Sequence, residues 1–309
     1  MKLMRPYPDE MVGSILSRAC RQFGLKPTPL LIALTGRRLI RHSLVVTNHA
    51  NIAEACGMSL EEFHLRHTIA MYAIAFVPEP YRNRLWQSAL SGNGRSNFAG
   101  MFGQGVSKWE VNLQYCPNCA VEDQRSFGES YWRRLHQIPG VTVCIQHRRA
   151  LVKSATSIVA SVPVPMPHRC GESRECVVPL SEQLQVSIAE WSEAAAAGFP
   201  GMNRSWMDWY RERAAACGYD PAHQALFSGS IASDLARFYG LDTLAALKCN
   251  VGPKTTNSWA ARLMRPHTVT ASSLKHILLA MFLDSWPLPS SGAAAFRDIK
   301  KGAPINSSR

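Results

Sequence analysis

The chain contains two short pairs of metal-binding residues, and their spacing restricts the fold between them. Cys116 and Cys119 form a Cys-x-x-Cys pair, and Cys144 and His147 form a Cys-x-x-His pair after a further 24 residues. Two such pairs separated by a loop are typical of a closed tetrahedral zinc site, to which each pair supplies two donors. Pro117 suits a sharp turn between the first two ligands, because its φ is fixed and it lacks an N–H group. We therefore predict one structural zinc ion (Zn) held by these four side chains.

Composition favours an intracellular protein with a polyanionic partner. The net charge is +12 over 309 residues, which is typical of proteins that contact nucleic acid. Nine cysteines are too few for the disulfide framework of a small secreted domain. No apolar signal segment follows Met1, and no apolar run is long enough to span a membrane. We expect a cytoplasmic protein with reduced thiols.

The segment between the two ligand pairs carries a more specific pattern than the ligands themselves. Gly128 is followed by the run Tyr131-Trp132-Arg133-Arg134 and then by Ile138-Pro139. This segment, with its flanking Cys and His pairs, resembles the TniQ/TnsD family of transposition target-selection proteins. Residues 6–10 and 14–18 resemble the N-terminal motif of that family, and residues 67–78 resemble its TnsD branch. The resemblance extends over residues 5–285.

The resemblance implies a non-catalytic target-site selection adaptor of a heteromeric transposon. Pro6, Tyr7, Glu10 and Arg18 resemble the segment that docks onto the AAA+ ATPase transposition regulator, a TnsC/TniB-like protein. The other implied partners are double-stranded target DNA or a guide-RNA complex on that DNA, with Cascade/Cas6 and guide RNA. Such a protein is bacterial and nucleoid-associated when on DNA. TnsD-type members that read a fixed attachment site carry further C-terminal DNA-binding modules, whereas members that work with guide-RNA complexes contact Cas proteins and RNA. Since the motifs lean towards the TnsD branch, direct contact with duplex DNA is the preferred interpretation, and targeting through a guide-RNA complex is the alternative.

The hydrophobic pattern predicts a mainly α fold in three regions and a flexible tail. Residues 1–112 form an N-terminal helical region, either helix-turn-helix-like around residues 30–42 or a plain bundle with a basic face. Residues 113–178 form the zinc-finger module, residues 179–286 a C-terminal helical helix-turn-helix region, and residues 287–309 the tail. Within the first region we expect helices at 11–22, at 60–74 after a capping box at Ser59, and at 82–90.

A basic stretch near the C-terminus is the main candidate for DNA contact. Residues 243–283 contain no Asp or Glu. Helices are expected at 231–238, 241–247 and 255–263, and a last one is expected after Ser272 or Ser273. Lys and Arg would neutralise phosphates, and Asn257 could reach a base edge. The alternative is a solvated or protein-docking face. The predicted DNA-binding residues are Lys248, Lys254, Asn257, Arg262, Arg265, His267 and Lys275, with Arg133 and Arg134 from the zinc-finger module.

A second group of metal-binding residue types follows the zinc-finger motif. His168, Cys170 and Cys176 come after a Val- and Pro-rich stretch at 161–167, which we expect to be extended. The group lacks a clear fourth ligand. The alternatives are a second zinc ion and two structural thiols, and the thiols are the preferred interpretation.

Motifs for catalysis are missing from the chain. A zinc deaminase needs an H-x-E motif and a metalloprotease needs H-E-x-x-H, and neither occurs. The segment Gly252-Pro253-Lys254-Thr255 is only weakly similar to a phosphate-binding loop, because proline stands where such a loop has glycine beside its lysine. We therefore predict that the protein is not an enzyme. The alternative to the adaptor is a zinc-containing DNA-binding transcriptional regulator, and a zinc nuclease is a weaker third candidate.

Overall fold

The chain folds into two compact units. The computed structural model describes residues 1–36, 49–91, 112–157, 164–170, 173–199, 205–219, 224–251, 258–265 and 272–285. The first unit holds the described residues of 1–71, 83–91 and 112–177, and the second holds those of 72–82 and 178–285. In the described part of the chain, no helix is both long and apolar enough to cross a membrane.

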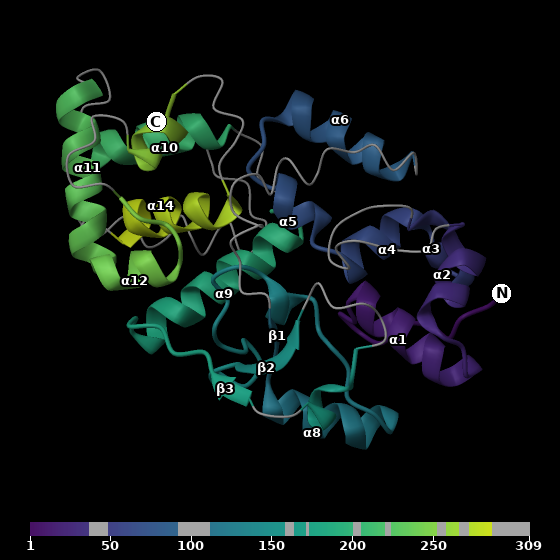
Figure 1. Ribbon diagram of the computed structural model, residues 1–309. Helices are drawn as coiled ribbons and strands as arrows, with labels where there is room; N and C mark the ends of the chain where they lie inside the picture. The colour runs from purple at the N-terminus through teal and green to yellow at the C-terminus, as the bar shows by residue number, and fades with distance from the viewer. Residues whose placement is uncertain are drawn as a thin grey trace. The chain divides into compact units, whose positions relative to one another are not determined.

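The first unit combines short helices with a small antiparallel sheet (Figure 1). The strands are β1 (Asn112–Tyr115), β2 (Val152–Ser157) and β3 (Ser173–Glu175), in the order β1-β2-β3. Its helices are α1 (Val12–Phe23), α2 (Pro27–Thr35), α3 (Ala50–Ala55), α4 (Leu60–His67) and α8 (Pro117–Phe127), with two 3-10 turns, η2 (Leu135–Gln137) and η3 (Pro167–Arg169). Helices α5 (Ala70–Ile74) and α6 (Glu79–Leu90) carry residues of both units.

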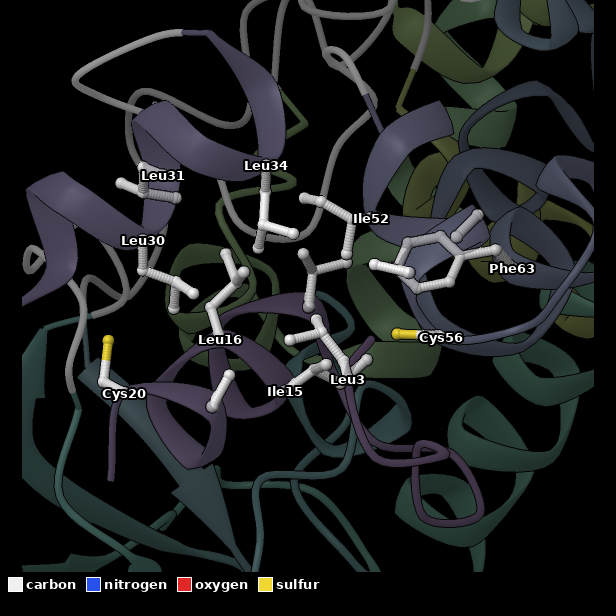
Figure 2. Packing of buried hydrophobic residues seen from close by; sticks show 14 residues of the cluster. Leu3, Ile15, Leu16, Cys20, Leu30, Leu31, Leu34, Ile52, Cys56 and Phe63 are labelled. Carbon is white, nitrogen blue, oxygen red and sulfur yellow. The ribbon is translucent and has the colours of Figure 1, made fainter. Parts of the chain in front are cut away.

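The helices at the N-terminus close around one apolar cluster, shown in Figure 2. Ile15 and Leu16 of α1 face Leu30 and Leu34 of α2, and Ile52 of α3 lies beside them. The apolar residues of α1 recur at the spacing of one helix face, so their burial requires partners on one side only. Helix α1 forms part of the core of the first unit. It begins and ends within one residue of the predicted bounds.

The expected single helix at 60–74 is wrong, because it is interrupted at Thr68. Ser59 caps α4 as predicted: its side chain accepts a hydrogen bond from the Glu62 N–H group, 3.1 Å away. Thr68 is extended, with φ −127° and ψ 169°, and α5 starts two residues later. The Thr68 hydroxyl donates to the His64 carbonyl and accepts from the Ala70 N–H group. This side chain satisfies backbone groups at both helix ends, which makes the break stable.

The second unit is helical in its described part. Its helices are α9 (Glu182–Ala196), α10 (Trp206–Ala216), α11 (Gln224–Tyr239), α12 (Leu241–Ala246), α13 (Trp259–Leu263) and α14 (Ser273–Ser285). Every residue of α14 from Ser273 to Leu283 except Lys275 is buried, and α14 contacts α9, α10, α11 and α13 (Figure 1). A helix that is apolar around its whole circumference must be covered on all sides, so α14 is the central element of this unit.

The C-terminal helices follow the sequence prediction with two differences in where helices start. The helix expected at 231–238 is α11, which already begins at Gln224. Gly240 separates α11 from α12 with φ 81°, a conformation that favours glycine. The helix expected at 255–263 begins only at Trp259, because the Ser258 side chain accepts from the Ala261 N–H group and caps it there. The expected turn after residue 91, the basic part of the N-terminal candidate helix-turn-helix (residues 37–42) and the tail lie outside the described residues.

The prediction of a mainly helical fold with a central Cys/His module is confirmed. The three-stranded sheet that supports this module was not anticipated. The predicted N-terminal region and zinc-finger module lie largely in one unit, whereas residues 72–82 belong to the unit formed by the C-terminal helices. The boundaries drawn at 112, 178 and 286 stay predictions.

Candidate metal centre

Two local structures present the four predicted ligands. Cys116 is the N-cap residue of α8 and Cys119 lies in its first turn, with Pro117 as the first helical residue. Pro117 therefore starts a helix instead of making the expected sharp turn, a position that tolerates its missing N–H group. Cys144 and His147 lie in a tight turn, closed by a hydrogen bond from the Arg148 N–H group to the Cys144 carbonyl at 2.8 Å. The antiparallel bridge between Val143 and Ala150 leads this turn towards β2.

The four side chains converge with the geometry of a tetrahedral metal site. Their ligand atoms all lie within 4.8 Å of one another. The Cys119 and Cys144 sulfurs are 3.6 Å apart, and the His147 Nδ1 atom lies 3.5, 3.4 and 3.6 Å from the sulfurs of Cys116, Cys119 and Cys144. Tetrahedral zinc with its usual bond lengths requires separations of about 3.8 Å between sulfurs and about 3.6 Å between sulfur and nitrogen. The donor set and its spacing therefore fit a zinc ion.

Mutual hydrogen bonds and burial shift the pKa values of the three thiols in different directions. The three cysteines are buried, with Cys116 fully inaccessible to solvent. Hydrogen bonds from Cys119 and then Cys144 lower the pKa of the Cys116 thiol, while burial opposes this shift. A thiolate is the form that binds metal. The contact with Cys116, followed by the contact with Cys144 and by burial, raises the pKa of Cys119, and the contact with Cys116 raises the pKa of Cys144, so Cys116 is the thiolate that the site itself supplies. The other two thiols would be deprotonated by a bound zinc ion.

Glu122 of α8 orients the histidine ligand, although sequence reasoning did not single it out. The His147 Nε2 atom lies 2.9 Å from the Glu122 carboxylate, while Nδ1 faces the three sulfurs. The Gln146 amide donates to the other carboxylate oxygen at 2.9 Å. A carboxylate on the outer nitrogen of a ligating histidine fixes the tautomer and makes the ring a better donor. The position of Glu122, one helical turn beyond Cys119, is a signal that the sequence did contain.

Replacing Glu122 with glutamine should weaken zinc binding by about 10- to 100-fold, because the amide cannot hold the histidine in the same way. Competition with a chromogenic chelator measures this change directly. Glu193→Gln is a matched control, since Glu193 is exposed on α9 of the second unit. Equal zinc affinities for Glu122→Gln and the control would show that Glu122 does not support the site.

The segment Tyr131-Trp132-Arg133-Arg134, here called the Tyr-Trp-Arg segment, connects the metal centre to the N-terminal residues of the chain. The Met11 N–H group donates to the Trp132 carbonyl, and the Arg134 N–H group donates to the Asp9 carbonyl, both at 2.9 Å. The Tyr131 hydroxyl donates to the Pro8 carbonyl at 2.9 Å. The N-terminal motif and the Tyr-Trp-Arg segment, which are far apart in the sequence, therefore contact each other within the first unit.

An ion pair lies beneath this contact. The Arg18 guanidinium donates to the Glu10 carboxylate at 2.8 Å and 3.3 Å, and both residues are buried. Ser14 and the Tyr7 N–H group also donate to the Glu10 carboxylate. The Arg18 guanidinium lies over the Tyr7 ring, 4.1 Å from its centroid. Of the four predicted partner-binding residues, Glu10 and Arg18 are thus internal, while Pro6 and Tyr7 are half-buried.

The two arginines of the motif also have acidic partners within the first unit. Arg133 donates to Asp123 of α8, and Arg134 donates to Asp9, each at 2.6 Å. Arg134 also donates to the Thr68 carbonyl, where α4 ends. Both had been predicted to bind DNA. Their charges are balanced where they lie, and their observed contacts join α8, the N-terminal segment and α4.

The C-terminal cations belong to neighbouring elements of the second unit. Lys248 and Arg262 are exposed, and Arg265 and Lys275 are half-buried. The Lys275 ammonium of α14 lies 6.0 Å from the centre of the Trp259 ring in α13, and the Trp259 indole donates to the Cys249 carbonyl. These contacts place α13, which carries Arg262, beside α14, which carries Lys275, and beside the segment after α12, which carries Lys248. Lys254, Asn257 and His267 lie outside the described residues.

The second group of metal-binding residue types does not converge among the described residues. The His168 Nδ1 atom lies 2.7 Å from the Ser130 hydroxyl, and the Cys176 thiol donates to Gln114 at 2.7 Å. Cys170 lies near the Thr156 hydroxyl and the Met166 carbonyl. In the described part of the chain, the set of Cys116, Cys119, Cys144 and His147 is the one group that could hold a metal ion.

Fold and site together define a mainly helical protein whose first unit contains a Cys3His metal-binding centre. The family model described as TniQ matches residues 3–151, from the N-terminal segment to the end of the second ligand pair. The chain is also 24% identical over 153 residues to the Transposon Tn7 transposition protein TnsD of Escherichia coli. That match covers 46% of this chain and 29% of TnsD, so it spans less than a third of the relative. Residues 3–151 therefore carry a TniQ domain, and over this part of the chain the resemblance that the motifs indicated is confirmed.

Proposed function

We propose that this protein is a non-catalytic target-site selection adaptor of a heteromeric transposon. In this role it binds target DNA, or a guide-RNA complex on that DNA, and recruits an AAA+ ATPase regulator. The observation that carries the proposal is the TniQ match, which covers both the N-terminal segment and the metal centre. The similarity to a transposition protein supports the same process.

The donor set supports a structural and non-catalytic role for the metal centre. Four protein ligands complete a tetrahedral zinc site, whereas catalytic zinc keeps one position for water or substrate. The centre would hold β1, α8 and the Tyr-Trp-Arg segment in one arrangement. Binding of zinc would stabilise the folded state of the first unit, and the surfaces around the centre would contact the partners.

Exposed apolar residues near the N-terminus suit the docking of the AAA+ partner. Phe23 is the last residue of α1, Leu25 follows it, and Ile32 lies on the neighbouring α2, with exposed fractions of 38%, 37% and 44%. Because Glu10 and Arg18 are buried, we assign them the role of holding α1 in place for this contact. Pro6 and Tyr7, both partly accessible, remain candidates for direct contact.

For DNA contact we retain the C-terminal cations. Lys248, Arg262, Arg265 and Lys275 would neutralise backbone phosphates, which gives affinity that depends on salt and little on sequence. Lys254, Asn257 and His267 extend the same proposal to residues between the described helices. Contact with Cascade/Cas6 and guide RNA is the alternative mode of targeting.

The test is co-assembly of the full chain with its AAA+ regulator in the presence of ATP and duplex DNA. We expect ATP-dependent capture, and Phe23→Ser combined with Ile32→Ser should weaken it about tenfold or more, since apolar anchors dominate such interfaces. Val121→Ser combined with Leu241→Ser is the matched control, because both residues are exposed apolar side chains elsewhere. A wild-type chain that does not assemble with the regulator would refute the adaptor role.

A further inference from the structure

Helix α2 is apolar around its whole circumference, and one side of it belongs to the core of the first unit. Its nine residues include no charged side chain. Leu30, Leu31 and Leu34 are buried in the apolar cluster of Figure 2, whereas Ile32 is exposed. A helix of this composition is normally covered on all sides, as α14 is in the second unit. The side of α2 that points away from the cluster is therefore a candidate for contact with a partner.

This side of α2 carries Pro29, Ile32 and Ala33, here called the outer face of α2. All three residues are exposed, and their spacing of three to four positions places them along one side of the helix. Ile32 protrudes between two smaller side chains, which allow the backbone of a partner to approach closely. Half of the large apolar side chains that are exposed in the described part of the chain lie in residues 1–32. Such a concentration marks an interaction surface.

Three cations are exposed around the outer face of α2. Lys26 is the N-cap residue of this helix. Lys2 and Arg5 lie in the N-terminal segment, where the Leu3 N–H group donates to the Ala55 carbonyl of α3 at 2.8 Å. Leu3 also joins the cluster that buries the inner side of α2. The segment with Lys2 and Arg5 is therefore packed against the same cluster as α2.

The acidic residues of this region do not neutralise these cations. Asp9 and Glu10 are the two acidic residues of positions 1–36, and both pair with arginines inside the unit. Glu54 is exposed on the neighbouring α3, which gives one carboxylate against three cations. The surface around the outer face of α2 thus has a net positive charge, and it is complementary to an acidic partner.

We propose that the outer face of α2 and its three surrounding cations bind an amphipathic segment of the AAA+ regulator in which acidic residues flank an apolar side. This inference rests on the proposed function and specifies the chemistry of the partner. Burial of Ile32 against the apolar side gives the complex its lifetime, because the loss of an apolar anchor mainly accelerates dissociation. The cations attract and orient the acidic residues, which raises the association rate and makes that rate depend on salt.

The test measures association and dissociation rates of the full, zinc-loaded chain with the ATP-bound regulator, without DNA, by biolayer interferometry at about 50 and 500 mM salt. Lys2→Gln combined with Lys26→Gln should lower the association rate at low salt about threefold or more, with the dissociation rate unchanged within about twofold. At high salt this variant should associate like the wild-type chain. Ala33→Gln places a longer polar side chain on the outer face and should accelerate dissociation about tenfold or more. Glutamine is a good helix former, so that loss would not come from unfolding of α2.

Arg125→Gln combined with Arg169→Gln removes the same charge from exposed positions on α8 and η3 and serves as the control. If the regulator binds, but the lysine variant associates like the control or Ala33→Gln dissociates like the wild-type chain, the inference fails and the adaptor role stands. A wild-type chain that does not bind the regulator would overturn both. Loss of duplex DNA binding by the lysine variant, with regulator binding intact, would overturn the inference in favour of a DNA surface. Dimers that Ala33→Gln abolishes without affecting regulator binding would overturn it in favour of an interface between copies.

Discussion

Cys144→Ser is expected to release the metal ion and unfold the Cys/His centre together with the strands and helix that it joins. A serine hydroxyl is a poor zinc ligand, and apparent binding free energies at structural sites are about 10–16 kcal/mol. Whole domains are stable by only about 5–15 kcal/mol, so this loss is large enough to unfold the module. The zinc-to-protein ratio and the near-ultraviolet circular dichroism of the buried Trp132 would report both effects.

Cys217→Ser is the matched control, since Cys217 lies in the second unit and its thiol donates to the Leu283 carbonyl instead of facing the centre. The control should retain one zinc ion per chain. A Cys144→Ser protein that stayed folded and metal-free would contradict the assignment of the centre as the structural element of this unit.

Glu10→Ala is expected to destabilise the first unit by about 3–5 kcal/mol, because it leaves the buried Arg18 guanidinium without its charge partner. Burial raises the pKa of Glu10 despite the opposing effect of Arg18, so this carboxylate is costly to bury and depends on its donors. The substitution also removes the acceptor for Ser14 and for the Tyr7 N–H group. Denaturant unfolding of the zinc-loaded chain, followed by tryptophan fluorescence, measures the change.

Glu62→Ala provides the surface comparison. Glu62 pairs with Arg66 at 3.5 Å across one turn of α4, and the Arg66 side chain is 65% exposed. An exposed pair of this kind contributes only about 0.3–0.5 kcal/mol. If Glu10→Ala were as mild as Glu62→Ala, the ion pair would not support the fold.

The metal centre could be predicted from the sequence because its information is local. Two ligands three positions apart can share a metal ion both in a tight turn and at the start of a helix. The site was therefore predicted correctly, although Pro117 begins a helix and not the expected turn. The sheet could not be predicted, since β1 and β3 are too short to show an alternating pattern. Both strands pair with β2, which lies between them in the sheet and follows the second ligand pair in the chain.

Other residues were recognised as important while their contacts were not. Glu10 and Arg18 resemble a docking motif, yet a sequence pattern does not distinguish a partner in another protein from a partner eight residues away. The break at Thr68 was missed for a similar reason. Helical spacing continues through residues 60–74, but Arg134, far away in sequence, binds the Thr68 carbonyl at the helix end.

The contact between the N-terminal segment and the Tyr-Trp-Arg segment limits how this protein can be recombined. Asp9 bonds to the backbone and side chain of Arg134, and Ser14 receives a hydrogen bond from the Trp132 N–H group. The Cys/His centre therefore cannot be exchanged between relatives as an isolated cassette. A chimera that keeps it intact must take residues 1–18 and 112–157 from the same parent.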